Sequence, residues 1–231
     1  LALDMTTGSI KWAKAAMSTD NWNVACIFGD ISNCPQGAGP DFDFGAGPNL
    51  FSISDGNGGT RKVIGAGQKS GEYWLLDAAT GSVLWTTQVG PGSSLGGIEW
   101  GTATDGQRIY VAISNLYGIP YAAGTAGSFA ALDPATGAIL WQTPDPNGRI
   151  DIGPVSVSNG VVFAGSMSGK MFAFDAATGA NLWTYQGQGS SNAGAAIDDL
   201  GNVYWGNGYS HLGTALGSGS TTFYSFSVGG K

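Results

Sequence analysis

One twelve-residue segment recurs four times along the chain, and it constrains the fold more than any other feature. Each copy has an apolar strand, an Asp, a turn that ends in Thr-Gly, a second short strand and a closing Trp. The copies are LALDMTTGSIKW (1–12), WLLDAATGSVLW (74–85), AALDPATGAILW (130–141) and FAFDAATGANLW (172–183). Asp can accept hydrogen bonds from the turn backbone and Gly supplies a residue with positive φ, so each copy predicts a β-hairpin.

The closing tryptophans indicate how one repeat meets the next. Four of the eight tryptophans in the chain occupy this single position. A large aromatic side chain at a fixed place in every repeat is suited to cover apolar surface between neighbouring repeats. We therefore expect Trp12, Trp85, Trp141 and Trp183 to be buried between repeats.

Two further strands precede the hairpin, most clearly in PVSVSNGVVFAGSMSGKMFAFD (154–175). Four short antiparallel strands per repeat form a β-propeller blade, and the 40 glycines of the chain supply the tight turns. The last spacing between repeat aspartates, 42 residues from Asp133 to Asp175, is close to one blade with short loops. The longer spacings carry insertions, the largest at about 13–48. We predict one all-β propeller domain over 1–231, with hairpins ending near residues 12, 85, 141 and 183 and a final partial blade at 184–231.

The sequences at the two ends of the chain do not decide whether the propeller closes into a ring. The chain opens on what reads as the third strand of a blade and closes on another, TTFYSFS (221–227). In one alternative, Ser9–Trp12 supplies the missing outer strand and closes a small ring. In the other, which the long insertions favour, the blades are part of a larger propeller.

Composition narrows the range of partners and compartments. A net charge of −7 and a pI near 4.3 disfavour nucleic acid and anionic membrane surfaces as partners. No apolar run reaches the roughly 18 residues that would predict a membrane span. Cys26 and Cys34 are spaced to close a small disulfide loop, as in an extracytoplasmic protein, with two buried thiols as the alternative. The sequence has no Cys-x-x-Cys-His motif and so predicts no c-type haem on this chain.

The hairpin repeat resembles the tryptophan-docking motif of PQQ-dependent quinoprotein dehydrogenases, which are eight-bladed propellers. It also occurs in PQQ-like propellers without a cofactor, such as the BamB-type assembly scaffold. Three more segments strengthen the resemblance, which is closest to the polyvinyl-alcohol dehydrogenase branch: GPDFDFGAGPNLF (39–51), GAGQKSGEYWLLD (65–77) and GGIEWGTATDGQRIYVA (96–112). The resemblance implies that the chain is about half of an eight-bladed propeller and a C-terminal portion of the enzyme.

The resemblance also implies roles for particular residues. Asp43 matches the general base that removes the hydroxyl proton of an alcohol, with Asp41 as a competitor two residues earlier. Both could also bind Ca²⁺. Lys69 matches the basic side chain that contacts the quinone, and Trp100 with Gly97 would lie against the planar cofactor. In the alternative interpretation, the aspartates cap turns, Lys69 is an ordinary turn lysine and Trp100 belongs to a blade core. We assign no role to His211.

Some family features are missing from this sequence. The Glu and Asn that hold Ca²⁺ in the family come from earlier blades, and the adjacent cysteine pair of many members is absent. Two functions therefore compete. One is a PQQ- and Ca²⁺-dependent enzyme that oxidises a small or polymeric alcohol and passes electrons to a cytochrome c on another chain. The other is a non-catalytic propeller that binds a protein, glycan or polymer.

Overall fold

The structure is a computed structural model that describes residues 1–29, 32–211 and 216–227. Its regular elements are short strands and one 3-10 turn, η1 (Val24–Cys26). The strands are β1 (Ala2–Leu3), β2 (Ile10–Trp12), β3 (Asn49–Ser54), β4 (Thr60–Gly67), β5 (Glu72–Asp77), β6 (Val83–Gln88), β7 (Ala103–Thr104), β8 (Ile109–Ile113), β9 (Ser128–Leu132), β10 (Ile139–Pro144), β11 (Ser156–Ser158), β12 (Val161–Gly165), β13 (Lys170–Asp175), β14 (Asn181–Gln186), β15 (Ala196–Ile197), β16 (Val203–Gly206) and β17 (Phe223–Phe226).

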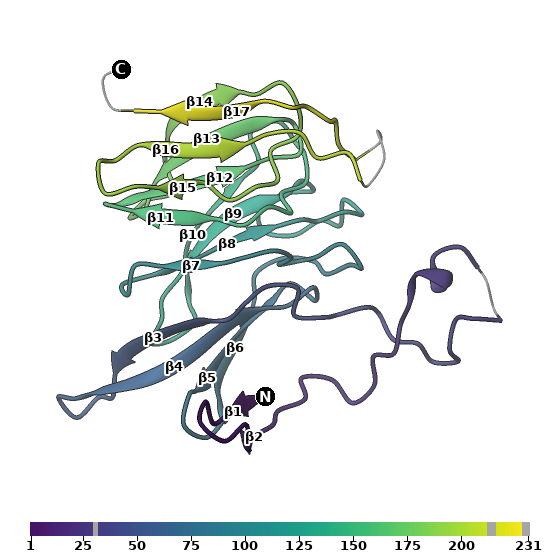
Figure 1. Cartoon of the computed structure of the whole chain (residues 1–231), viewed down its shortest axis with the longest axis vertical. Helices are drawn as coiled ribbons and strands as arrows, with labels where there is room; N and C mark the ends of the chain where they lie inside the picture. The colour runs from purple at the N-terminus through teal and green to yellow at the C-terminus, as the bar shows by residue number, and fades with distance from the viewer. Residues whose placement is uncertain (30–31, 212–215, 228–231) are drawn as a thin grey trace.

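The strands form antiparallel sheets in chain order, as the repeat predicts. Blade A (β3–β6), blade B (β7–β10) and blade C (β11–β14) each have four strands. A two-stranded hairpin (β1–β2) precedes them and a three-stranded sheet (β15–β17) follows. Figure 1 shows these sheets stacked one after another from the purple N-terminal end to the yellow C-terminal end. The all-β propeller fold of four-stranded blades is confirmed.

The small closed ring is not formed. That alternative needs the segment Ser9–Trp12 to pair with the last sheet, but β2 pairs with β1. In the described part of the chain, β17 pairs with β16 alone and lies at the edge of its sheet. The N-terminal hairpin and β17 lie at opposite ends of the stack in Figure 1.

The hydrophobic core lies between the blades rather than within one sheet. One cluster joins blades A and B, a second joins blades B and C, and a third joins blade C to the last sheet. β8 and β9 are buried along their whole length because blade B has a neighbour on each face. Their sequences, IYVAI and SFAAL, are accordingly almost continuous apolar runs.

The hairpin turns form as the motif predicts. In blade A the Asp77 carboxylate accepts hydrogen bonds from the amides of Ala79 and Thr80 and from the Thr80 hydroxyl, at 3.0–3.1 Å. The same set of bonds surrounds Asp4, Asp133 and Asp175. The hairpins at 74–85, 130–141 and 172–183 correspond to β5–β6, β9–β10 and β13–β14.

Three of the four repeat tryptophans dock on the turn of the next blade. The indole Nε1 of each donates to a backbone carbonyl at 3.1 Å; the pairs are Trp12 with Ala78, Trp85 with Pro134 and Trp141 with Ala176. The turn glycine lies under the ring, and a Cβ on Gly179 would be 2.5 Å from the Trp141 indole. Gly179 also has a φ of +72°, so glycine is required there for two reasons.

The burial of the four rings differs from the prediction. Trp141 is buried and Trp12 and Trp85 are half-buried, whereas Trp183 departs furthest. Its side chain is 36% exposed, whereas Trp141 is 9% exposed. The last sheet has three strands within the described residues and brings no Asp-x-x-Thr-Gly turn to Trp183. The indole packs instead edge-on against Phe226, with ring centroids 5.0 Å apart. The expectation of a buried ring at this position was therefore wrong.

The largest insertion forms an arm that projects from the stack. The purple segment that carries η1 extends beyond the sheets in Figure 1. The predicted disulfide between Cys26 and Cys34 is present in this arm. The arm returns to the sheets at Pro40–Phe44, where it reaches the candidate site.

Candidate functional site

Three segments that the sequence singled out meet at Lys69, in the turn between β4 and β5. The Lys69 amide donates to the Asp43 carbonyl at 2.9 Å. The Lys69 carbonyl accepts from the amides of Ser93 and Gly97, at 3.1 and 2.9 Å. Backbone hydrogen bonds thus tie the segment 39–51, the turn of Lys69 and the loop that leads to β7 into one unit.

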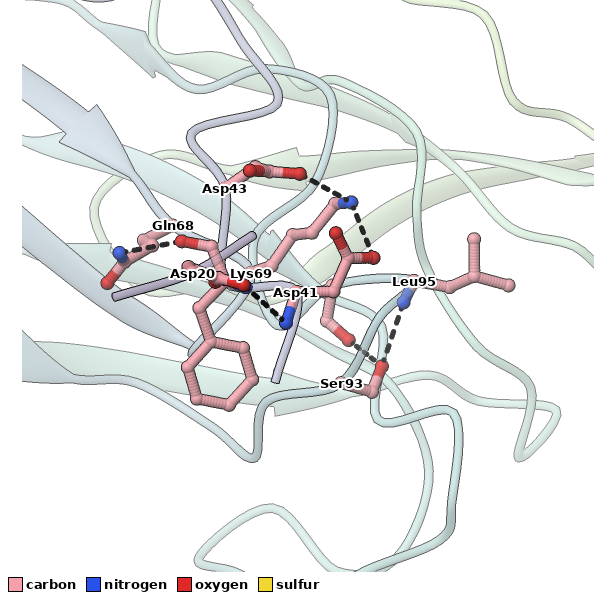
Figure 2. Close-up of polar contacts among 9 residues, drawn as sticks. Asp20, Asp41, Asp43, Gln68, Lys69, Ser93 and Leu95 are labelled. Atoms are coloured by element: carbon pink, nitrogen blue, oxygen red, sulfur yellow. Dashed lines mark hydrogen bonds and ion pairs between the residues drawn. The ribbon is translucent and has the colours of Figure 1, made fainter. Parts of the chain in front are cut away.

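The side chains of Asp41, Asp43 and Lys69 form an ionic cluster, shown in Figure 2. The Lys69 Nζ lies 3.1 Å from Asp41 Oδ2 and 3.2 Å from Asp43 Oδ2. The Asp41 and Lys69 side chains are 7% and 13% exposed, whereas that of Asp43 is 61% exposed. The ion pair of Asp41 and Lys69 is therefore buried, and Asp43 is the carboxylate of the cluster that an incoming molecule can reach.

Two residues that the sequence analysis did not select hold this cluster in place. The Asp20 carboxylate accepts hydrogen bonds from the amides of Asp41 and Phe42, and Asp41 has a φ of +65°. The Gln68 side chain donates its Nε2 to the Phe42 carbonyl at 2.8 Å, and its Oε1 accepts from the Trp74 indole at 3.2 Å. The contacts that Asp20 and Gln68 make with Asp41 and Phe42 join residues 21 to 26 positions apart, so no local motif predicts them.

Glu99 is a further acidic group at the site and was also missed. Its side chain is 6% exposed, and within the described residues its Oε2 has no hydrogen-bond partner. Burial raises the pKa of Glu99 to about 7; the Lys69 charge opposes this rise, and the charges of Asp41 and Asp43 add to it. A carboxyl that is buried among charges in this way is typical of a functional site.

Burial and pairing also set the charges of the central pair. Burial raises the pKa of Asp41, and the hydrogen bond from Lys69 opposes that rise. Burial by itself would lower the pKa of Lys69, but the Asp41 hydrogen bond and the Glu99 charge outweigh it, so this pKa is raised. Lys69 is therefore an ammonium ion at neutral pH.

Gly97 and Trp100, the two other predicted cofactor contacts, lie in surroundings that differ from each other. Gly97 packs under the turn of Lys69, and a Cβ on it would be 2.1 Å from the Gly71 amide nitrogen. Trp100 precedes β7 instead of lying in a strand, and it lines a separate cavity of about 580 Å³ with Asn192 and Tyr209. Its ring centroid is 5.4 Å from that of Tyr209.

The described residues do not form a calcium site by themselves. No group of three or more His, Cys, Asp or Glu among them could hold a metal ion. The Lys69 ammonium already occupies the space between Asp41 and Asp43, the two predicted ligands. No described helix is long and apolar enough to cross a membrane.

Comparison with known proteins agrees with this architecture. The family profile of the outer membrane protein assembly factor BamB matches residues 123–199. A polyvinylalcohol dehydrogenase from a Pseudomonas species is 37% identical over 147 residues, which is 63% of this chain and 22% of the relative. One from Sphingopyxis sp. strain 113P3 is 36% identical over 144 residues, 61% of this chain and 21% of the relative. The matched stretch thus spans about a fifth of each relative.

Two solved structures show the same fold. The quinohemoprotein alcohol dehydrogenase of Comamonas testosteroni has a TM-score of 0.61 at 18% identity, over 83% of this chain and 39% of that one. The enzyme ADHIIG of Pseudomonas putida HK5 has a TM-score of 0.60 at 18% identity, over 74% and 35% of the two chains. The chain is therefore a β-propeller that resembles the PQQ-dependent alcohol dehydrogenases in sequence and in fold.

Proposed function

We propose that this chain takes part in the PQQ-dependent oxidation of an alcohol, with Asp43 and Lys69 at the reacting centre. The observation that carries the proposal is one ammonium ion shared between a buried carboxylate and an exposed one. Asp43 is open to solvent and can accept the hydroxyl proton of an alcohol. PQQ, when bound there, would accept the hydride from the carbon that bears this hydroxyl.

Lys69 is suited to contact such a cofactor. An ammonium group has three N–H donors, and two of them bind Asp41 and Asp43. The third remains for a ligand oxygen, and the raised pKa keeps the group charged. A quinone oxygen bound there would be polarised toward accepting hydride. The buried Asp41 would orient the Lys69 side chain and would not contact the substrate.

The finer assignments are proposals that follow from the relatives. Polyvinyl alcohol or another secondary alcohol is the proposed substrate, since two relatives are polyvinylalcohol dehydrogenases. A cytochrome c on another chain is the proposed electron acceptor. The disulfide supports an extracytoplasmic location, where such bonds persist. Calcium remains a prediction from the resemblance.

The test is turnover of a secondary alcohol by the protein after incubation with PQQ, followed with an artificial electron acceptor. We expect Asp43→Asn to lower turnover at least a hundredfold, because it removes the proton acceptor. Its thermal unfolding should stay unchanged, because the side chain is largely exposed. Asp55→Asn, in the turn between β3 and β4, is the matched control and should turn over normally.

Turnover by Asp43→Asn at the wild-type rate would remove Asp43 from the mechanism. If the wild-type protein binds no PQQ at all, the alternative of a non-catalytic binding propeller takes the place of this proposal.

A further inference from the structure

The arm comprises the described residues 20–29 and 32–41, and hydrogen bonds and a disulfide join these two segments. The Asn21 amide donates to the Ala38 carbonyl at 2.9 Å, and the Asn23 side chain donates to the Asn33 carbonyl at 2.9 Å. The Cys26–Cys34 disulfide closes the arm further out. At its base, the Asp20 carboxylate binds the amides of Asp41 and Phe42. The arm is therefore a pre-ordered structure that ends at the candidate site.

The arm does not serve the hydrophobic core. None of the arm's described residues, 20–29 and 32–41, belongs to the three core clusters. Its apolar side chains are left largely in water: Val24 is 60% exposed, Ile27 59% and Phe28 79%. An ordered insertion that keeps apolar side chains exposed is typical of a binding element.

The arm forms one wall of a groove of about 450 Å³. The opposite wall comes from the loop that follows β6 and from the loop that follows β8. The side chains that matter for binding are Trp22, Ile27, Phe42, Ser94 and Tyr117. The lining contains aromatic rings, aliphatic carbon and hydroxyl groups, and it contains no charged residue.

The groove adjoins the backbone of the candidate site, although Asp41, Asp43 and Lys69 are not among its lining residues. Phe42, in its lining, lies between Asp41 and Asp43 in the chain. Ser93, also in its lining, donates its amide to the Lys69 carbonyl at 3.1 Å. Figure 2 shows Ser93 beside the ionic cluster. A chain that lies in the groove would thus lead toward Asp43.

We propose that this groove binds an extended, uncharged, hydroxyl-bearing chain, a polyol, and presents one of its carbinol groups to Asp43. The inference rests on the proposed function and adds to it the surface that selects a long substrate over a small alcohol. Methylene groups of a polyol would pack on Trp22 and Tyr117, and its hydroxyls would bond to Ser94 and the Tyr117 hydroxyl. The net charge of −7 disfavours a polyanion. A purely apolar peptide would leave the groove hydroxyls without partners.

The experiment measures binding without cofactor or turnover, by calorimetry with a narrow length fraction of poly(vinyl alcohol). Polyethylene glycol, which lacks side hydroxyls, and polyacrylate, which is charged, are the comparison polymers. We expect poly(vinyl alcohol) to bind more tightly than either. Tyr117→Ala, whose side chain is 66% exposed and whose loss leaves folding intact, should weaken that binding at least tenfold. Trp22→Ala should do the same.

Phe28→Ala is the matched control, because Phe28 is an exposed aromatic residue of the same arm and lies outside the groove lining. It should leave poly(vinyl alcohol) binding unchanged. The binding assay needs neither PQQ nor turnover, so loss of catalysis and loss of the groove are distinguishable. The proposal is overturned by any of three results: no binding of poly(vinyl alcohol), binding that Tyr117→Ala and Trp22→Ala do not weaken, or binding that Phe28→Ala weakens equally. The first result would leave an exposed apolar arm suited to a protein partner.

Discussion

Removal of a docked tryptophan should cost far more stability than removal of the undocked one. Trp141 is 9% exposed, packs over Gly179 and donates to the Ala176 carbonyl at 3.1 Å. Truncation of a buried Trp to Ala costs about 3–5 kcal/mol. Trp183 occupies the same motif position, but it is 36% exposed and packs against the rings of Phe226 and Tyr185. Such aromatic contacts are worth about 0.5–1.5 kcal/mol each.

We therefore expect Trp141→Ala to lower the free energy of unfolding by about 3–5 kcal/mol and Trp183→Ala by about 1–3 kcal/mol. The assay is urea unfolding followed by far-UV circular dichroism, with the free energy taken by linear extrapolation. The two variants remove the same side chain from the same position in the repeat, so the comparison isolates docking. Equal losses of stability in the two variants would refute the claim that the turn of the next blade provides the stabilisation.

Two more predictions concern Asp151 and Asp20. Burial and the neighbouring Asp145 raise the pKa of Asp151 well above 3.8. The folded state therefore binds a proton at Asp151 more tightly than the unfolded state does. The stability that this proton contributes is lost as pH rises from about 4 through the raised pKa. Asp151→Asn should remove this pH-dependent loss of stability. The melting temperature of the variant should therefore exceed that of the wild type by a margin that grows from pH 4 to pH 8. A constant difference in melting temperature across this pH range would contradict the prediction. Asp20→Ala frees the amides of Asp41 and Phe42 and should weaken PQQ binding severalfold, as measured by equilibrium titration. An unchanged affinity would show that Asp20 does not position the ionic cluster.

The parts of the fold that depend on short-range chemistry were predictable. The Asp-x-x-Thr-Gly turns form because each Asp binds amides two and three residues ahead, so the hairpins could be located from the sequence. The disulfide joins cysteines eight positions apart and was predictable for the same reason. Trp183 was misjudged because its burial depends on a turn from another blade, which lies outside its own repeat.

The candidate site was predictable only in part. The acidic segment and Lys69 could be paired through the family resemblance, and the structure brings their side chains within 3.2 Å. Asp20 and Gln68 escaped notice because they act through backbone groups on distant segments. Glu99 lies next to Trp100, which was selected, but burial beside Lys69 is a tertiary property. One signal was available: Glu99 is one of only two glutamates in the chain, and it stands in a Gly-Gly-x-Glu-Trp-Gly segment.

The most direct test of the central claim is a titration of the protein with PQQ, followed by the absorbance of the quinone. The account predicts saturable binding that Lys69→Met weakens at least tenfold, because the variant lacks the ammonium that is proposed to contact the quinone. Lys62→Met, an exposed lysine on β4, is the matched control and should bind like the wild type. Equal affinity of the wild-type protein and Lys69→Met for PQQ would contradict the account.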